Sequence, residues 1–246
     1  FRSERKPEAI FGIHVGISAI AGGFAVTPGP MMAAADRWKM KVLGRQTHGA
    51  RPWDGIDPIV VGSQIVLAFQ TIVSRQVDVT KAPSIISVGR FTGGIRNNVI
   101  PDEVVMEGTI RTFDPEMRGY IHEAMERTAT AIAESAGAGI EFEIDDGGTP
   151  AVINDAALTE RMMPAIRRVS GDKPVAKITP QTVAEDFAEF QQVIPGLYLF
   201  LGSLPRGMDP AGAPTNHSPF FTIHEPDMEM GVRLFAHMVV DYLQGQ

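Results

Sequence analysis

The sequence contains no cysteine and comparatively little basic charge. The absence of cysteine excludes disulfide bonds, thiolate metal ligands and cysteine nucleophiles. Lys and Arg number 22 against 29 Asp and Glu, so the net charge is −7 and no basic field is available to hold a polyanion. We therefore expect no nucleic-acid partner, and small or neutral substrates suit this chain better.

Long apolar runs are also missing from the printed sequence. No run approaches the roughly 20 apolar residues that a membrane helix needs, and the opening FRSERKPEAIFGIHV does not have a signal-peptide pattern. These features predict no membrane association and a cytoplasmic location. The 246 residues, of which 44% are hydrophobic, suffice for one large or two ordinary globular domains.

The middle of the chain, residues 34–147, has the pattern of one complete domain. Apolar residues that alternate with charged ones predict strands, and Asp-Pro pairs followed by apolar residues at helical spacing predict capped helices. The expected elements are a strand from residue 36, a helix over 57–74, strands over 84–91 and 104–113, a helix over 114–137 and a strand over 140–144. The order βαββαβ is that of the ferredoxin-like unit, in which two helices cover one face of a four-stranded antiparallel sheet.

The flanking segments, 1–33 and 148–246, have the pattern of a second domain. Apolar runs alternate with helical patterns in both segments, which indicates an α/β layer structure. We expect strands at 9–15, 22–27 and 197–201, and helices from Asn154, around 183–190 and from Pro226. With only three or four strands this α/β domain is incomplete, and the middle unit is inserted into it.

Four short motifs carry residues that suit chemistry. His14 ends an apolar strand in GIHV, and His48 lies in the loop THGARPWDGIDP before a well-capped helix. Asn98 stands in the polar connection NNVIPD, and His217 in NHSP follows a loop rich in glycine and proline. Each residue taken alone has an ordinary explanation as well: a core histidine for His14, and loop or turn residues for the other three.

Together these motifs resemble the zinc- or manganese-dependent amidohydrolase and carboxypeptidase family that includes aminoacylases, hippurate hydrolase and indole-acetyl-amino-acid hydrolases. The resemblance spans nearly the whole chain. It implies a catalytic α/β domain, here 1–33 and 148–246, and an inserted domain, here 34–147, that mediates homodimerisation. It also implies two divalent metal ions, zinc or manganese, and a small N-acyl amino acid or peptide-like substrate.

The resemblance assigns metal binding to His14 and His217. Glu225 is the acidic residue that follows the second histidine, as in the family. A dinuclear hydrolytic site needs about three protein ligands per ion, so two imidazoles do not suffice. The family carries further ligands upstream, in a Cys-Gly-His-Asp motif and a Glu-Glu pair, and neither motif occurs here. We therefore expect that this chain lacks the N-terminal half of the catalytic domain.

The resemblance also assigns roles to three residues of the inserted domain. His48 reaches from one subunit into the active site of the other and donates a hydrogen bond to the oxyanion of the tetrahedral intermediate. Asn98, with Asn97 as a competitor, and Arg111 of GTIRTFD bind a substrate carboxylate. Without the resemblance, a turn asparagine and a solvated strand arginine explain the last two positions equally well.

Other conspicuous residues have more ordinary interpretations. Glu185 and Asp186 of VAEDFAEF resemble a family segment near the site, but an acidic pair at a helix start also suits the helix dipole. We expect Trp53 to be a partly buried loop anchor and not a substrate contact. We interpret three further histidines as structural or surface residues: His122, His224 and His237.

The sequence thus predicts metal-dependent hydrolysis of the amide bond of N-acyl amino acids or similar small conjugates, with no activity from this chain by itself. A rival interpretation is a non-catalytic module that dimerises or binds, because the βαββαβ unit is complete and the catalytic unit is not. Metal content distinguishes the two, since only the first requires bound divalent ions.

Overall fold

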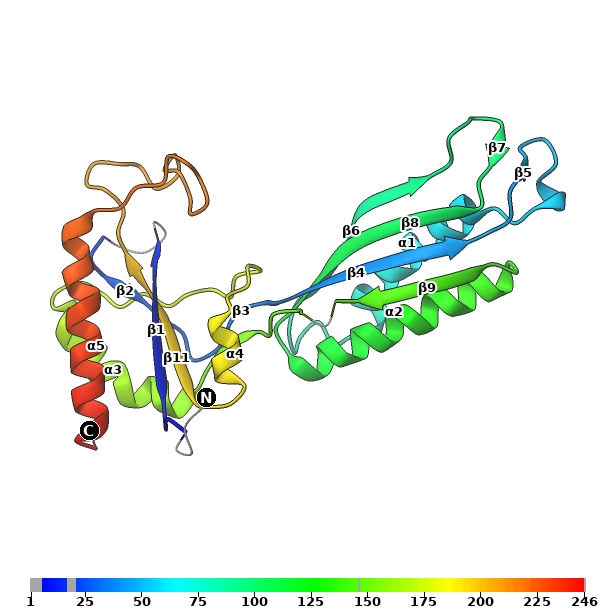
Figure 1. Cartoon of the computed structure of the whole chain (residues 1–246). Helices are drawn as coiled ribbons and strands as arrows, with labels where there is room; N and C mark the ends of the chain where they lie inside the picture. Colours follow the sequence, from blue (N-terminus) through cyan, green and yellow to red (C-terminus); the bar gives the residue numbers. More distant parts are fainter. Residues whose placement is uncertain (1–5, 17–20, 146, 246) are drawn as a thin grey trace. The chain divides into compact units, whose positions relative to one another are not determined.

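The computed structural model describes residues 6–16, 21–145 and 147–245, which form two compact units. Unit 1 comprises residues 1–32, 152–181 and 185–246, and unit 2 comprises residues 33–151 and 182–184. Helices and strands occur in both units (Figure 1), so the expected α/β class is confirmed.

Unit 2 is built on a four-stranded antiparallel sheet. Its strands are β4 (Ala34–Leu43), β6 (Ser84–Gly93), β8 (Glu103–Thr112) and β9 (Gly139–Ile144). They lie in the order β6-β8-β4-β9. The helices α1 (Pro58–Thr71) and α2 (Pro115–Ser135) cover one face of the sheet (Figure 1), which is the arrangement of the split βαββαβ unit.

Both helices of unit 2 begin at the Asp-Pro pairs. The Asp57 side chain accepts hydrogen bonds from the backbone N–H groups of Ile59 and Val60, and Asp114 accepts one from Met117. A short π-helical turn, η2 (Ile72–Gln76), continues α1. The helices and the alternate strand residues enclose the core of the unit, whose fully buried members include Met40, Ile65, Phe69, Met106, Ile110, Ile121 and Met125.

The run Pro58–Gln76 is long and apolar enough, by length and composition alone, to cross a membrane. Residues Ile65, Phe69 and Ile72 of this run pack in the core of unit 2, and a core helix of a globular domain meets the same criterion.

Unit 1 contains a three-stranded sheet. β1 (Ile10–Gly16) runs parallel to β11 (Gly196–Gly202), and β11 pairs antiparallel with β2 (Phe24–Ala25). A separate pair joins β3 (Gly29–Met32) to β10 (Val152–Asn154). The helices of this unit are α3 (Ala156–Ser170), α4 (Phe187–Gln191) and α5 (Met228–Leu243), the last preceded by the 3-10 turn η3 (Glu225–Asp227).

The position of β11 between two packed layers explains why its sequence is apolar throughout. Leu197, Leu199 and Leu201 pack in a cluster with residues of α3 and α5. Tyr198 and Phe200 point to the opposite face and pack with residues of α4, β3 and β10. Because both faces are covered, all seven residues of the strand are buried.

Some expected boundaries were wrong. Asn154 was expected to open a helix, but it ends β10, and Asp155 caps α3 instead. The buried Asn154 side chain donates to the carbonyls of Thr27 and Tyr198 and accepts from the Tyr198 N–H, so tertiary contacts outweigh its preference for a helix start. The short helix expected from residue 183 begins at Phe187.

Candidate active site

His14 lies in β1, beside the rings of Tyr198 and Phe200 of the neighbouring strand. Its Nδ1 is 2.6 Å from the carbonyl oxygen of Val15. A carbonyl oxygen only accepts hydrogen bonds, so Nδ1 is the donor, and in the neutral ring Nε2 then holds the lone pair. Metal-bound histidines commonly have this second contact, which fits Nε2 of His14 as a metal ligand.

His217 lies in the long loop between β11 and η3, residues 203–224. The base of the loop is closed by a hydrogen bond from the His224 N–H to the Ser203 carbonyl, at 2.8 Å. Further along, the Asn216 side chain donates to the Val15 carbonyl at 3.2 Å. The structure therefore brings the His217 segment to the end of β1 that carries His14.

The two histidines do not make a complete metal site with other described residues. Among residues 6–16, 21–145 and 147–245, no group of three or more His, Asp or Glu side chains is placed to hold a metal ion. Glu225 lies in η3 and takes part in no such group. Two imidazoles are suitable ligands for part of a dinuclear site, and such a site requires further ligands from elsewhere.

His48 and Asn98 lie together at one end of unit 2. Two short strands, β5 (Thr47–His48) and β7 (Val99–Ile100), pair antiparallel and join their two loops. The Gly49 N–H donates to the Asn98 carbonyl at 2.8 Å. A side chain at Gly49 would lie 3.2 Å from the backbone of Asn98, so the close approach of the loops favours glycine there.

The imidazole of His48 is oriented by the backbone. The Ala50 N–H donates to Nδ1 of His48 at 3.0 Å, so Nδ1 is an acceptor and the ring proton lies on Nε2. The side chain is exposed, which leaves this Nε2–H free to donate. Such a donor is what stabilisation of a developing oxyanion requires.

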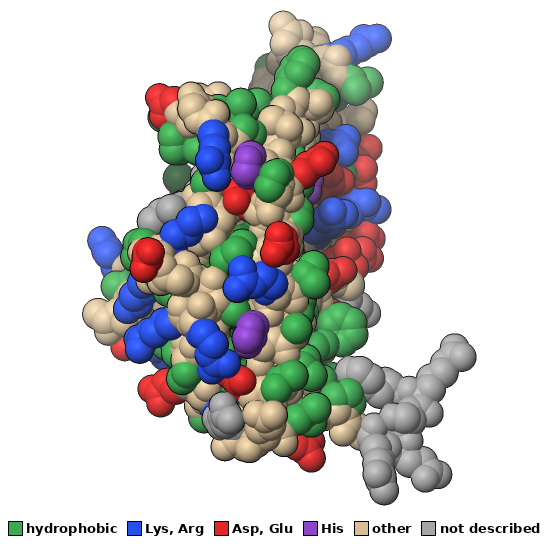
Figure 2. Space-filling view, turned by 90° about the vertical axis from the view of Figure 1, so that its left-hand side faces the viewer, with side chains coloured by type: hydrophobic (Ala, Val, Ile, Leu, Met, Phe, Trp, Pro, Cys, Tyr) green, Lys and Arg blue, Asp and Glu red, His purple; other side chains and the backbone are tan. Residues whose placement is uncertain are grey.

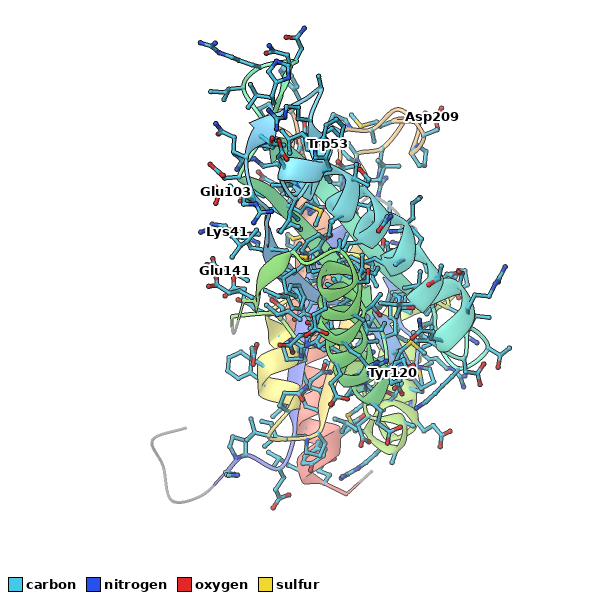
Figure 3. All side chains as sticks on the ribbon, turned by 90° about the vertical axis from the view of Figure 1, so that its right-hand side faces the viewer. Lys41, Trp53, Glu103, Tyr120, Glu141 and Asp209 are labelled. Carbon is cyan, nitrogen blue, oxygen red and sulfur yellow. The ribbon has the colours of Figure 1, made fainter. Side chains whose placement is uncertain are left out.

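Arg111 lies on the face of the sheet that the helices leave open. Lys39 and Lys41 on this face stand opposite glutamates of neighbouring strands, and Lys41 forms an ion pair with Glu141 at 3.2 Å (Figure 3). The cross-strand neighbours of Arg111 are Ala35 and Ile85, both uncharged. Arg111 is half-buried and has no charged residue directly opposite it, so its guanidinium is available to an external carboxylate.

Arg111 and Asn98 are far apart within one chain. Arg111 is the ninth residue of β8, whereas Asn98 precedes the start of that strand and lies with His48 in the joined loops. Eight residues of extended strand span roughly 27 Å. Asn98 and Arg111 of a single chain therefore cannot both bind one small carboxylate, as was expected of them.

Glu185 has a local structural role. Its carboxylate accepts a hydrogen bond from the Tyr198 hydroxyl at 2.6 Å and lies 3.4 Å from the Phe187 N–H at the start of α4. Burial, and after it the hydrogen bond and charge of Glu185, raise the pKa of Tyr198 far above its usual value. Gly12 makes room for this arrangement, because a Cβ there would meet the Tyr198 ring at 2.6 Å.

Trp53 was expected to be a partly buried anchor, and this was wrong. It lies in the 3-10 turn η1 (Pro52–Asp54) of the His48 loop, and 73% of its surface is exposed (Figure 3). An ion pair between Arg51 and Asp54 at 2.6 Å and the backbone bridge between Arg45 and Ile56 hold the loop, so the indole is not needed as an anchor.

The three remaining histidines lie beside charged residues. His122 Nε2 is 3.1 Å from Asp36, and His224 Nδ1 is 3.3 Å from Asp227. His237 contacts Arg168 at 3.4 Å. Two other groups were not predicted from the sequence. The Asn216 amide binds a backbone carbonyl 201 residues away, and the Ala50 N–H is a backbone donor that no residue type marks.

The chain is similar to known proteins over nearly its whole length. The model of the family described as "Peptidase family M20/M25/M40" matches residues 1–241. Thermostable carboxypeptidase 2 of Saccharolobus solfataricus is 34% identical over 95% of this chain and 58% of its own length. N-acetyl-L-cysteine deacetylase of Bacillus subtilis is 36% identical over 89% of this chain and 50% of its own length.

A solved structure gives the same result. The YXEP protein of Bacillus subtilis, a dinuclear metal binding peptidase from the M20 family, superposes with a TM-score of 0.76 at 32% identity. The match covers 96% of this chain and 58% of that protein. The chain thus spans 50 to 58% of the length of these three relatives.

Proposed function

The chain belongs to peptidase family M20/M25/M40, and on that premise we propose that the complete protein hydrolyses the amide bond of N-acyl amino acids or similar small conjugates. The names of its relatives, a carboxypeptidase and a deacetylase of N-acetyl-L-cysteine, support amide chemistry on small acyl amino acids. The observation that carries the proposal is that the Nδ1 contacts of His14 and His48 are opposite. Nδ1 of His14 donates, which suits Nε2 as a metal ligand, and Nδ1 of His48 accepts, which suits Nε2–H as a donor.

We propose His14 and His217 as ligands of two divalent ions, zinc or manganese. Such ions, when bound, polarise the amide carbonyl and activate water for attack. The further ligands belong to parts of the complete protein outside the described residues, in keeping with the absence of a three-ligand group among them.

Unit 1 has surfaces that suit such further parts. Among the described residues, β1 has a neighbouring strand on one side only. Helix α5 carries a second apolar row that is exposed: Val232, Phe235, Val239 and Leu243. The view from the side of α5 (Figure 2) shows hydrophobic side chains at the surface there. A strand beside β1 and a helix against α5 would cover both surfaces.

The residues of unit 2 act on the substrate in this proposal. His48 donates its Nε2–H to the amide oxygen as negative charge develops on it, a contact that strengthens toward the transition state. Arg111 binds the substrate carboxylate with its planar guanidinium, and Asn98 adds a neutral donor. Asn97 competes with Asn98, since both are exposed and neither side chain bonds to a described residue.

The separation of these residues favours a homodimer. Roughly 27 Å of extended strand separates Arg111 from the loops of His48 and Asn98. One small substrate can therefore contact Arg111 and these loops together only if a second copy of the chain supplies one of them. The exposed edge of β6 and the exposed apolar residues of α1, Ile59, Val60 and Leu67, offer a surface for that copy.

The experiment is a hydrolysis assay of the complete protein after removal and return of metal. We expect release of free amino acid from N-acetyl and N-benzoyl amino acids, loss of activity after chelation, and recovery with zinc or manganese. A folded, metal-loaded protein that cleaves none of these amides would refute the proposal. A chain of residues 1–246 that dimerises without metal or activity would instead fit a non-catalytic module, which the absence of a three-ligand group favours for this chain alone.

A further inference from the structure

The carbonyl oxygen of Val15 accepts two side-chain hydrogen bonds in unit 1. One comes from Nδ1 of His14 at 2.6 Å, and the other from the Asn216 amide at 3.2 Å. A carbonyl oxygen has two lone pairs, so it accommodates both donors. A single backbone atom therefore connects the segment of one proposed metal ligand to the segment of the other.

The backbone beside Asn216 is unusual. His217 has a φ of 73°, and no other described residue except glycine has a positive φ. This left-handed conformation is unfavourable for a histidine and persists only where surrounding contacts determine it. The turn itself is local, with a hydrogen bond from the Ser218 N–H to the Thr215 carbonyl at 3.0 Å. Asn216 is the residue of this turn that reaches out to β1.

We propose that Asn216 is a positioning residue for the metal site: its amide holds the His217 turn against the end of β1 by sharing the Val15 carbonyl with His14. This proposal rests on the proposed role of His14 and His217 as ligands. Asn216 touches neither metal nor substrate in it, and it acts through the place and orientation of the His217 imidazole.

The chemistry of the contact sets the requirement for asparagine. The side chain must donate, because its partner is a carbonyl oxygen. Aspartate has nearly the same shape but presents an anionic oxygen to that carbonyl, so it loses the bond and repels the acceptor. Alanine removes the bond without adding a charge. Thr215 provides a matched control, since it is exposed in the same turn and its side chain has no hydrogen bond to a described residue.

The test compares metal retention in the complete protein and in its variants Asn216→Asp, Asn216→Ala and Thr215→Ala. Competition with a chelator gives the dissociation constant of zinc, and the visible spectrum of the cobalt-substituted protein gives the ligand geometry. We expect both Asn216 variants to bind zinc about 10- to 100-fold more weakly and to change the cobalt spectrum. We expect Thr215→Ala to match the parent protein in both measurements.

Each outcome decides the inference. Equal zinc affinity and an equal cobalt spectrum in a folded Asn216→Ala variant would overturn it. If Asn216→Asp fails to fold, Asn216→Ala alone decides, because it leaves no unpaired charge. A parent protein that retains neither zinc nor manganese would refute the proposed function itself, whereas a parent that binds zinc only as tightly as its Asn216 variants do would refute only the role of Asn216.

Discussion

Among single residues, His14 and His48 differ in the hydrogen bond that Nδ1 makes, and this difference decides what Nε2 can do. Nδ1 of His14 donates to the Val15 carbonyl, which in the neutral ring leaves a lone pair on Nε2. Nδ1 of His48 accepts from the Ala50 N–H, which leaves a proton on Nε2. The first tautomer suits a metal ligand and the second suits a hydrogen-bond donor, so the backbone partner of each ring selects its chemistry.

This difference makes His48 a test of transition-state stabilisation. In the complete protein, His48→Ala should lower kcat and kcat/KM in similar proportion, by roughly 10²-fold or more, because the lost donor acts on developing charge. The zinc or manganese content should stay unchanged, which elemental analysis will check. A variant that raises KM alone would instead place His48 in ground-state binding.

Asp36 is the other residue whose environment predicts a measurable effect. Burial on its own would raise the pKa of Asp36, but hydrogen bonds from His122 and from Arg118, the latter at 2.6 and 3.0 Å, outweigh burial and hold that pKa below its usual value of 3.8. The carboxylate is 1% exposed. Removing one partner from such a buried ion pair costs about 3 kcal/mol of unfolding free energy.

We therefore expect Asp36→Asn to destabilise the protein by about that amount at pH 7, as measured by urea unfolding. A depressed folded pKa stabilises the fold above the unfolded pKa, and the benefit disappears as the pH falls through the folded pKa. The difference between variant and parent should thus persist down to about pH 4.5 and shrink below pH 3.8. Glu141→Gln, which removes the exposed pair with Lys41, should change little at any pH.

At the scale of helices and strands, local patterns predicted what local physics determines. The alternation around Trp38 and Met40 gave the strand β4, and Asp57 and Asp114 marked the starts of α1 and α2. Features that depend on distant contacts were missed. The pair of β5 and β7 needs two loops about 50 residues apart to meet, and Asn154 ends a strand because its amide bonds to β11 and to Thr27.

The same limit applied to the candidate site. The motifs singled out His14, His48, Asn98, Arg111 and His217, and their roles remain predictions. The sequence could not show that Trp53 is exposed or that Asn216 reaches Val15, because both depend on how a loop packs. Nor could it show which ring nitrogen carries the proton, since that depends on the position of a backbone partner.

The two N-caps of unit 2 differ in a way that stability measurements can detect. Asp57→Ala should cost about 1 kcal/mol, since the side chain caps two N–H groups and forms no ion pair with another described residue. Asp114→Ala should cost more, because Asp114 also pairs with Lys81 at 3.0 Å. Replacement of either by Asn, which keeps a cap, should recover most of the loss at Asp57 and less at Asp114. Equal losses in urea unfolding would contradict this order.

At the scale of the whole molecule, the placement of the candidate residues bears on the oligomeric state. Unit 2 presents His48 and Asn98 at one end of its sheet and Arg111 near the other. A substrate of a few ångströms cannot bridge roughly 27 Å of strand, so a site that uses all three residues needs contributions from two chains. Sedimentation of the complete protein should therefore show a dimer at micromolar concentration.

Mixing of variants tests whether His48 acts across that dimer. The complete protein carrying His48→Ala lacks the donor, and the complete protein carrying His217→Ala lacks a proposed metal ligand, so each homodimer should be nearly inactive. In a heterodimer, the subunit with an intact His217 faces the partner that has kept its His48, and one site of two is complete. Random exchange makes half of the dimers mixed, so we expect recovery to roughly one quarter of parent activity. If heterodimers form, as native mass spectrometry will show, and activity does not recover, His48 acts within its own subunit.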